Sequence, residues 1–301
     1  MLGRGVAERL ASDPAHELFA PEVVTAVREA DLVVLNLECC ISERGEPAPR
    51  RVFHFRAPPV AAERLAELGV DCVTLANNHA LDFGPEALLD TLAYLDAAGI
   101  AHVGAGADVA QARAPVVLDE NGFRLAVRAL TDHPVEYAAG LGLPGVAYAD
   151  LRRGVPAWVT AAIPEVDALL ISPHWGPNMN PEPLPYVREA AAALLDGGAT
   201  LVAGHSAHVF QGVAQRVLYD LGDFLDDYRV DPRLRNDLGL LFLVDLPGDR
   251  IEAVPLKLEF TRTRLADGND AAWIRRRFAA ACEALGTDVD VENGRLVLRW
   301  R

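Results

Sequence analysis

Apolar and polar positions alternate between residues 21 and 220 in blocks that predict helices and strands in turn. Helical spacing occurs over residues 21–30, 59–68, 85–98 and 185–195, and Gly69 and Gly99 follow two of these segments, as is common after helix ends. Short apolar runs that predict buried strands lie at residues 32–37, 72–76, 124–130, 168–171 and 200–203. This βαβ alternation predicts an α/β fold with a mostly parallel sheet and helices on both faces.

The pattern changes after residue 215. Short apolar runs at residues 216–219, 240–246, 251–256 and 295–298 predict strands, and residues 271–285 predict one late amphipathic helix. With so little helix between them, these strands favour a second, more antiparallel sheet, and hence a sheet-on-sheet core flanked by helices. We predict a main domain over residues 1–250, with strands and a helix in residues 251–301 completing the same domain.

Composition restricts the function classes. The chain has 301 residues, 51% of them hydrophobic, and a mean hydropathy of +0.12, which is typical of a folded protein. Its formal net charge is -15, from 43 acidic and 28 basic residues, which argues against a nucleic-acid or anionic-membrane surface. An anionic substrate stays possible, because a bound metal inverts the local field.

Targeting and redox signals are sparse. No apolar stretch reaches the ~18 residues of a membrane span, so the chain as written is expected to be cytoplasmic and soluble. Its four cysteines include no CxxC pair, which disfavours a disulfide scaffold. Cys39 and Cys40 are interpreted as small buried residues at a strand end, the alternative being soft metal ligands.

Metal-ligand residue types follow four of the predicted strands. In open α/β sheets, ligands bind outside the carboxyl ends of the strands. Four strand ends carrying carboxylate, amide and imidazole groups therefore predict one shared site, suited to one or two divalent metals. The motifs are Asn36-Leu37-Glu38, Asn77-Asn78-His79, His174-Trp175-Gly176 and Gly204-His205-Ser206-Ala207-His208.

Each motif alone has a structural alternative. Asn78-His79 fits a capped turn, His174 fits a hydrogen-bonded loop, and Glu38 needs either a metal or an arginine, because an unpaired buried carboxylate is costly. A single HxxH pair such as His205 and His208 is a weak signal. The coincidence of all four at successive strand ends favours the metal site.

For the other charged residues and histidines, ordinary structural roles are considered first. Arg4, Arg56 and Arg128 fit either a grip on an anionic substrate or ordinary salt bridges. A surface or packing role is predicted for the remaining histidines. For an acidic cluster, the prediction is a solvated loop, and the alternative is a place at the rim of the site. These residues are His16, His54, His102 and His133, and Asp220, Asp223, Asp226 and Asp227.

Taken in order, the motifs resemble the CapA-type poly-γ-glutamate biosynthesis proteins, a branch of the calcineurin-like metallophosphoesterase superfamily. The resemblance covers residues 1 to about 228. It is carried by Met-Leu-Gly-Arg at residues 1–4, Asn-Leu-Glu at 36–38, Phe-Arg-Ala-Pro-Pro at 55–59, Leu-Ala-Asn-Asn-His-Ala-Leu-Asp-Phe-Gly at 75–84, His-Trp-Gly at 174–176, Gly-His-Ser-Ala-His-Val at 204–209 and Tyr-Asp-Leu-Gly-Asp-Phe at 219–224.

The resemblance implies a four-layer α/β/β/α sandwich and metallophosphoesterase-like hydrolysis with two divalent metals, Mn, Fe or Zn. It places His79 as the acid–base residue behind the metal ligands. Arg4 and Arg56 would face the substrate, and Asn77 is predicted as a further substrate contact. The implied metal ligands are Glu38, which would bridge or contact the metals, and Asn78, His174, His205 and His208.

One departure concerns the amino terminus. Members of the family carry a strand ending in Gly-Asp just before Met-Leu-Gly-Arg, and its Asp is a metal ligand, whereas this sequence begins at Met1. We therefore expect a sheet that lacks its first strand or holds it truncated. A start site placed too late and an inactive protein are the two explanations, and a membrane anchor or export signal would be lost with the same segment.

Three functions follow from the resemblance. The first is a metal-dependent hydrolase of an anionic peptide polymer of the poly-γ-glutamate type, or of a phosphate ester. The second is a metal-dependent peptide epimerase, and the third is a non-catalytic subunit of a polymer synthesis or export complex at a membrane. The substrate, the metal and the oligomeric state are not determined by the sequence.

Overall fold

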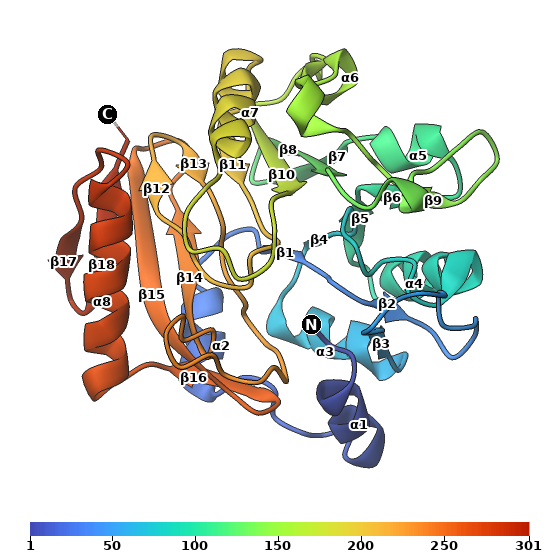
Figure 1. Ribbon diagram of the computed structural model, residues 1–301, viewed down its shortest axis with the longest axis horizontal. Coiled ribbons are helices and arrows are strands. Elements are labelled where there is room, and N and C mark those ends of the chain that lie inside the picture. Colours follow the sequence, from blue (N-terminus) through green and yellow to red (C-terminus); the bar gives the residue numbers. More distant parts are fainter. Residues whose placement is uncertain (301) are drawn as a thin grey trace.

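A computed structural model describes residues 1–300 and contains three main sheets (Figure 1). The first is parallel, with the order β1 (Val34–Asn36), β4 (Cys72–Thr74), β5 (Ala101–Val103). Helices α3 (Val60–Leu68) and α4 (Gly84–Ala97) connect these strands. Gly69 takes the left-handed conformation, with φ 97°, and ends α3, which a residue with a Cβ would do only with strain.

The second sheet has six strands in the order β12-β13-β11-β10-β8-β7. Strands β8, β10, β11 and β13 are mutually parallel, while β7 and β12 run antiparallel at the two edges. Helix α7 (Pro185–Asp196) connects β10 to β11. The strands are β7 (Val116–Glu120), β8 (Phe123–Thr131), β10 (Ala168–His174), β11 (Leu201–Ala203), β12 (Val213–Ala214) and β13 (Val217–Leu218).

The third sheet is antiparallel, in the order β14-β15-β18-β17, with β16 also paired to β15. Helix α8 (Gly268–Glu283) lies alongside this sheet, at the left of Figure 1. Its strands are β14 (Leu238–Val244), β15 (Arg250–Glu259), β16 (Arg262–Leu265), β17 (Asp290–Glu292) and β18 (Arg295–Arg299).

Shorter elements complete the chain. Helices α1 (Gly5–Ser12) and α2 (Pro21–Val27) precede β1. Two-stranded ladders join β2 (Cys40–Ile41) to β3 (Arg56–Ala57) and β6 (Ala105–Gly106) to β9 (Gly145–Val146). The others are α5 (Val109–Arg113), α6 (Ala157–Thr160) and the 3-10 turns at Val135–Tyr137 and Leu151–Arg153.

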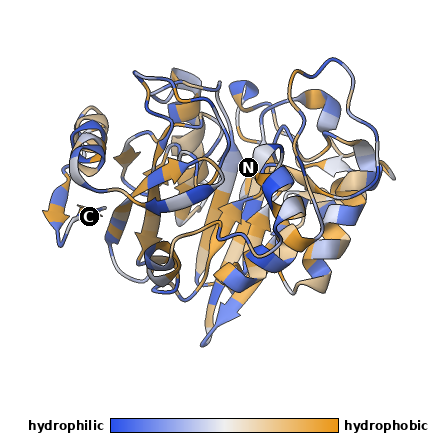
Figure 2. Cartoon of the chain, turned by 90° about the horizontal axis from the view of Figure 1, so that it is seen from below, coloured by the Kyte–Doolittle hydropathy of each residue, from blue (hydrophilic) through white to orange (hydrophobic). Residues whose placement is uncertain are grey.

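Three hydrophobic clusters hold the sheets and helices together. The helix-side cluster joins α1, α2, α3 and α4 to one face of the first and third sheets. The inter-sheet cluster lies between those sheets and the six-stranded sheet and includes α8. A third cluster packs α6 and α7 on the outer face of the six-stranded sheet. In Figure 2 the interior strands are coloured mostly as hydrophobic and the helices alternate, because only one stripe of each helix is buried.

Most predicted elements are confirmed, with shifts at their ends. In one such shift, β10 continues through Pro173 and ends at His174, beyond the strand predicted at residues 168–171. Two predictions are wrong. The strands expected in one mostly parallel sheet divide between the first sheet and the six-stranded sheet. The strand at residues 216–219 was predicted in the antiparallel sheet, but β13 pairs parallel with β11 in the six-stranded sheet. Strands without a predicted counterpart are β2, β3, β5, β6, β7, β9, β12, β16 and β17.

The helices give one further negative finding. Within residues 1–300, no helix combines the length and the apolar composition that a membrane crossing requires.

Candidate functional site

Two buried histidines meet where β10 and β11 end. His174 closes β10, His205 follows β11, and the two residues form a parallel bridge. Their Nδ1 atoms are 2.7 Å apart, so one ring donates to the other, and His205 Nε2 lies 3.2 Å from the Ser172 hydroxyl. Burial, with the neighbouring imidazoles, lowers the pKa of His174 well below its usual value and that of His205 to about 3. Both rings are therefore neutral, which is the form that binds metals.

His208 links this pair to the first sheet. Its Nδ1 lies 3.0 Å from Asp223 Oδ1, and its Nε2 lies 3.8 Å from Glu38 Oε1. Burial disfavours the charged ring, but the carboxylates of Asp223 and Glu38 outweigh it and raise the pKa of His208 to about 10. The other Glu38 oxygen accepts a hydrogen bond of 3.0 Å from Asn36 Nδ2. An imidazole and an amide thus contact Glu38, where an arginine had been the alternative to a metal.

His79 is oriented by the carboxylate of Asp82, a residue of the 75–84 motif for which no role was predicted. Asp82 Oδ2 lies 2.6 Å from His79 Nδ1 and also accepts the Phe55 N–H at 2.8 Å, while Asp82 Oδ1 accepts the Tyr137 hydroxyl at 3.3 Å. Asp82 is fully buried. This arrangement fixes the His79 ring and leaves its Nε2 as the nitrogen available for proton exchange.

We predict that Asp82→Ala lowers the free energy of unfolding by about 3 kcal/mol, because it leaves two or three buried donors without an acceptor. Urea unfolding at neutral pH measures the change. Tyr137→Phe, which removes only the longest of the three bonds, serves as the matched control and is expected to cost about 1 kcal/mol or less. Equal losses in the two variants would show that Asp82 contributes no more than its hydrogen bond with Tyr137.

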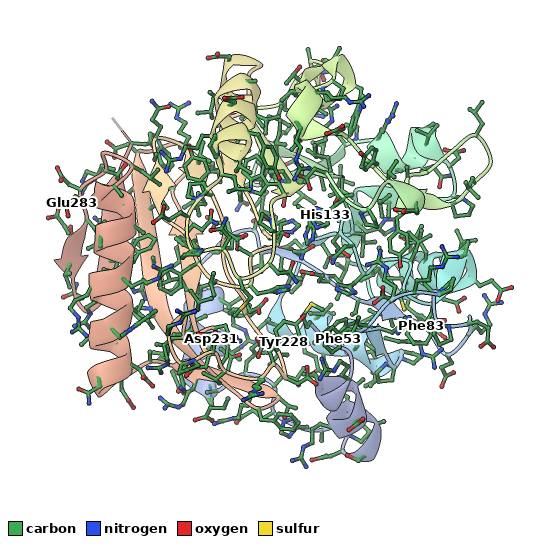
Figure 3. All side chains as sticks on the ribbon, viewed as in Figure 1. Phe53, Phe83, His133, Tyr228, Asp231 and Glu283 are labelled. Atoms are coloured by element: carbon green, nitrogen blue, oxygen red, sulfur yellow. The ribbon has the colours of Figure 1, made fainter. Side chains whose placement is uncertain are left out.

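His133, predicted at the surface or in packing, borders the site instead. Its ring centroid is 5.0 Å from that of His174, and its Nδ1 is hydrogen-bonded to Asp132 Oδ1. The second Asp132 oxygen accepts the Tyr186 hydroxyl at 2.7 Å. The position of His133 follows from the strand pairing. Because Thr131 of β8 pairs with His174 of β10, the residues just after β8 lie beside His174. Figure 3 labels His133.

The acidic cluster after β13 is buried and Asp223 contacts His208, so the predicted solvated loop is wrong. Asp220 and Asp226 are 2% and 6% exposed. Burial raises the pKa of Asp220 to about 7, and burial together with the neighbouring Asp223 raises that of Asp226 to about 8, while His208 holds the pKa of Asp223 below its usual value. The ring of Tyr228, also labelled in Figure 3, lies 5.1 Å from that of His208.

The three predicted substrate contacts differ in position. Arg4 lies over Phe53 and Phe55, with its Nε 3.5 Å from Asp227, and its side chain is 37% exposed. Arg56 lies 4.0 Å over the ring of Phe83 and donates to the Arg44 carbonyl. Arg4 thus borders the buried acidic cluster, whereas the contacts of Arg56 are with neither the imidazoles nor the carboxylates of the site.

Asn77 holds backbone and side-chain groups of the site together. It is fully buried, and its amide donates to Asn36 Oδ1 at 3.0 Å and to the Leu37 carbonyl at 2.9 Å. Its oxygen accepts the backbone N–H of His79 at 3.1 Å. The side chain therefore fixes the ends of β1 and β4 to each other, and the substrate contact predicted for it stays a prediction.

The remaining candidates lie away from the site. The Arg128 guanidinium donates to the carbonyls of Val159 and Ala161, so it forms neither of the two contacts considered for it. His16, His54 and His102 contact Thr261, Ala48 and Asp96 respectively, as expected for peripheral residues. All four cysteines are buried and free, and burial raises the pKa of Cys39 to about 11.

The model of a protein family, the bacterial capsule synthesis protein PGA_cap, matches residues 1–228. The chain belongs to this family. The matched residues include every imidazole and carboxylate of the site described above. The PGA_cap membership confirms the resemblance drawn from the motifs.

Individual relatives agree with the PGA_cap assignment. The chain is 33% identical over 284 residues to a probable polyglutamine synthesis accessory protein of Mycobacterium tuberculosis, covering 86% of this chain and 74% of the relative. It is 27% identical to the PGA biosynthesis protein CapA of Bacillus subtilis, covering 75% of this chain and 61% of that protein. A crystal structure of a hypothetical protein from Thermus thermophilus covers 82% of this chain and 93% of its own, at 17% identity and a TM-score of 0.39.

Several atoms with metal-ligand chemistry in this PGA_cap chain are buried without a hydrogen-bond partner. At the site they are Glu38 Oε1, Asn78 Oδ1, His174 Nε2 and Asp223 Oδ2, with Asp226 Oδ2 and Asp227 Oδ1 in the acidic cluster, while His102 Nδ1 is one elsewhere. A buried polar atom without a partner is costly, so the chemistry of this donor set fits a cation. Within residues 1–300, however, no three histidine, cysteine or carboxylate side chains already surround a common point, so an amide donor or side-chain movement is needed to complete a metal site.

Proposed function

We propose that this PGA_cap chain is a metal-dependent enzyme that acts on an anionic peptide polymer of the poly-γ-glutamate type, or on a phosphate ester, in capsule or polymer biosynthesis. The relatives named for capsule and PGA biosynthesis support the process. The observation that carries the enzymatic part is the set of buried donor atoms without partners beside two neutral imidazoles.

The proposed ligands are Glu38, Asn78, His174, His205 and His208. One or two divalent metals, Mn, Fe or Zn, would supply polarisation of a carbonyl or phosphoryl oxygen. The chain's own residues supply the rest. His79, held through Nδ1 by Asp82, is oriented to exchange a proton at Nε2, and Arg4 offers a partly exposed guanidinium to an anionic group.

We also propose that the fold is the four-layer α/β/β/α sandwich expected from the resemblance, with its first strand truncated. The order of the hydrophobic clusters supports four layers. Helices α1 to α4 come first, then the first and third sheets side by side, then the six-stranded sheet, and finally α7. Two unpaired strand edges support the truncation of the first strand. Within residues 1–300, β1 and β14 each pair with a neighbouring strand on one side only.

Metal content tests this proposal. Elemental analysis is made on the 301-residue chain and on a form extended upstream to include a Gly-Asp strand. We expect about two metals in the longer form and few or none in the shorter one, because the upstream Asp would complete the donor set. If neither form holds metal, the donor residues are a remnant of the fold and the enzymatic proposal fails.

A peptide epimerase is the second candidate, favoured by one observation. Two imidazoles, His79 and His133, are each oriented by a carboxylate, Asp82 and Asp132 respectively, and proton removal and return at a backbone α-carbon suits two such groups. Deuterium uptake from solvent into a poly-γ-glutamate peptide without cleavage would favour the epimerase. Cleavage without uptake would favour the hydrolase.

A non-catalytic subunit of a synthesis or export complex is the third candidate. The lack of a preformed site among residues 1–300 favours it. Co-purification with membrane proteins, together with no metal in the extended form, would support this role over both enzymes.

A further inference from the structure

An arginine, a tyrosine, a carboxylate and an imidazole form a series of contacts at His79. The Cζ atom of Arg51 lies 4.5 Å from the centroid of the Tyr137 ring. The Tyr137 hydroxyl donates to Asp82 Oδ1 at 3.3 Å, and the other Asp82 oxygen lies 2.6 Å from His79 Nδ1. Arg51 belongs to the segment between β2 and β3. This Arg51 series therefore connects that segment to the imidazole proposed for proton exchange.

The same four residue types recur at His133. The Cζ atom of Arg152 lies 4.3 Å from the centroid of the Tyr186 ring on α7. The Tyr186 hydroxyl donates to Asp132 Oδ2 at 2.7 Å, while Asp132 Oδ1 is hydrogen-bonded to His133 Nδ1. In Figure 1, α7 lies at the top and the β2–β3 ladder at the lower right, with β10 and β4 between them. The Arg152 series and the Arg51 series thus reach the site from two directions.

Both series end beside His174. The ring centroids of His133 and His174 are 5.0 Å apart. Burial lowers the pKa of His174 most, and neighbouring imidazoles, His133 and His79 among them, lower it further. Because such effects weaken with distance, His79 also lies near His174. The two arginines therefore belong to one site and not to two separate surfaces.

The two guanidinium groups keep their N–H donors free of carboxylates. Within residues 1–300, neither Arg51 nor Arg152 forms an ion pair, and the contact of each is with the face of a tyrosine ring. The adjacent Arg153 differs, since it pairs with Asp150 at 3.1 Å. A guanidinium stacked on a ring keeps its planar edge open, and that edge matches a carboxylate in a bidentate pair. Each arginine is thus held in place and ready to bind an anion.

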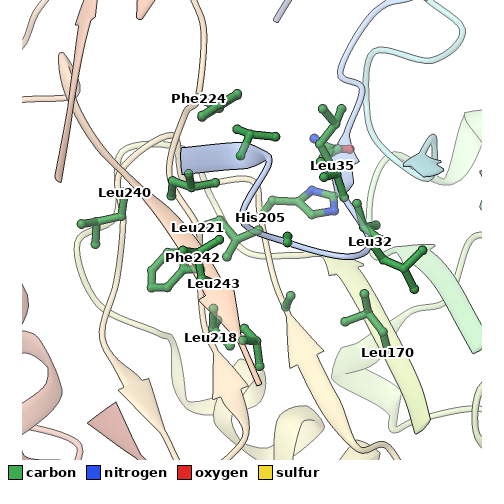
Figure 4. A pocket seen from close by; sticks show the side chains of 18 of the residues that line it. Leu32, Leu35, Leu170, His205, Leu218, Leu221, Phe224, Leu240, Phe242 and Leu243 are labelled. Carbon is green, nitrogen blue, oxygen red and sulfur yellow. The ribbon is translucent and has the colours of Figure 1, made fainter. Parts of the chain in front are cut away.

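The large cavity beside His205 does not provide the path for an anion. It has a volume of about 800 Å³, and Figure 4 shows leucine and phenylalanine side chains around His205 there. Its lining includes the carboxylates of Glu38 and Asp223, which repel an anion, and within residues 1–300 it includes neither His79 nor His133. An anionic substrate is therefore expected on the side of the two arginines.

We propose that Arg51 and Arg152 bind two carboxylates of the same linear polyanion, one on each side of the unit that reacts. The inference rests on the proposed function and deepens it, because it selects a carboxylate-bearing peptide polymer over a small phosphate ester. A polymer that spans both arginines passes His79 and His133, whereas a single phosphate group reaches only one guanidinium. Arg51 and Arg152 are thus assigned as specificity-determining residues.

Binding of γ-linked glutamate oligomers tests this assignment. A fluorescent dimer and a fluorescent octamer are titrated into the 301-residue chain, in chelator and at low salt, and binding is followed by anisotropy. We expect the octamer to bind at least ~10-fold more tightly than the dimer, because it reaches both arginines. Arg51→Gln and Arg152→Gln are each expected to weaken octamer binding by ~10-fold, and the double variant by ~100-fold.

The matched control is an arginine that lies on an aromatic ring outside the two series. Arg113 has its Cζ 4.8 Å from the centroid of the Trp158 ring, and Arg113→Gln removes the same charge from the same kind of contact. It should leave octamer binding unchanged. Circular dichroism checks that all variants fold. Phenyl phosphate, added at the same concentration as the glutamate units, should not displace the octamer.

Four results would overturn the inference. Unchanged octamer binding in both glutamine variants, or an equal loss in Arg113→Gln, would show that the two arginines form no subsites. Equal binding of dimer and octamer would show that no chain spans them, and displacement by phenyl phosphate would favour the small ester. Octamer binding that depends on both arginines, in a chain whose extended form holds no metal, would support this inference while the enzymatic proposal fails. Metal in that form without octamer binding would do the reverse.

Discussion

Replacing His205 by alanine is expected to remove bound metal and abolish hydrolysis. His205 is 5% exposed and neutral, so it is ready to bind a metal without losing a proton first. Loss of a direct ligand should weaken metal binding by more than ~100-fold, since even residues that only orient ligands contribute 10- to 100-fold. Calorimetric titration with Mn²⁺ and Zn²⁺, on the form that binds metal, measures the affinity. Hydrolysis of a phosphodiester and of poly-γ-glutamate measures activity.

The control for this variant is a histidine outside the site. His102→Ala removes an imidazole whose contact is with Asp96, and it should leave both metal binding and activity unchanged. His205→Ala also leaves His174 Nδ1 without its partner, which should cost about 1–3 kcal/mol of stability, so its folding is checked by urea unfolding. Normal metal content and normal activity in folded His205→Ala would exclude His205 as a ligand.

Much of this site could be predicted because strand ends are visible in sequence. Asn36, Asn78 and His205 each follow a short apolar run, and the carboxyl ends of parallel strands meet at one edge. The three helices α3, α4 and α7 were located by their spacing and by the residues that bound them. The prediction of one mostly parallel sheet was wrong, because these strands belong to two different sheets, with His208 and Glu38 making the contact between them.

The parts that escaped prediction depend on contacts between segments distant in sequence. Ser172-Pro173 signals a strand end locally, but pairing with β8 carries β10 on to His174. The acidic segment after β13 has the composition of a solvated loop, yet it is buried against His208 and Met1. His133 carries no motif, and only its place after the neighbouring strand brings it to His174. Burial of polar residues is a property of the tertiary structure and not of local pattern.

The second large effect is a steep loss of stability of the metal-free protein as pH rises from about 6.5 to 8. Asp220 and Asp226 have folded pKa values of about 7 and 8, above the usual carboxyl value. The folded state therefore holds protons that the unfolded state has released, and this stabilisation is lost as pH rises through 7 and 8. His208, with a folded pKa of about 10, adds stability that is complete below about pH 6.5 and is lost by pH 10.

Below about pH 6.5 the histidines and the carboxyls change the free energy of unfolding in opposite directions. His174 and His205 have lowered pKa values, so their contribution falls as pH drops below about 6.5, where they are protonated only in the unfolded chain. This loss offsets the gain from the protonated carboxyls, and stability should change little between about pH 4.5 and 6.5. Above pH 6.5 every one of these groups lowers the free energy of unfolding as pH rises. Each proton that the folded state binds in excess of the unfolded state contributes about 1.4 kcal/mol per pH unit. We expect a total loss of more than ~2 kcal/mol by pH 8.

Urea unfolding at half-unit pH intervals, in chelator, measures this profile, and Asp226→Asn is the matched variant. The amide is close in size to the carboxyl and cannot ionise, so the variant should be more stable than the parent at pH 8.5 and should show a shallower slope. Asp96→Asn, at a carboxylate that is 72% exposed, should follow the parent. An unchanged slope in Asp226→Asn would show that Asp226 is already ionised at neutral pH. Excess Mn²⁺ should reverse the slope in any form that binds it, because binding to carboxylate and imidazole ligands displaces their protons.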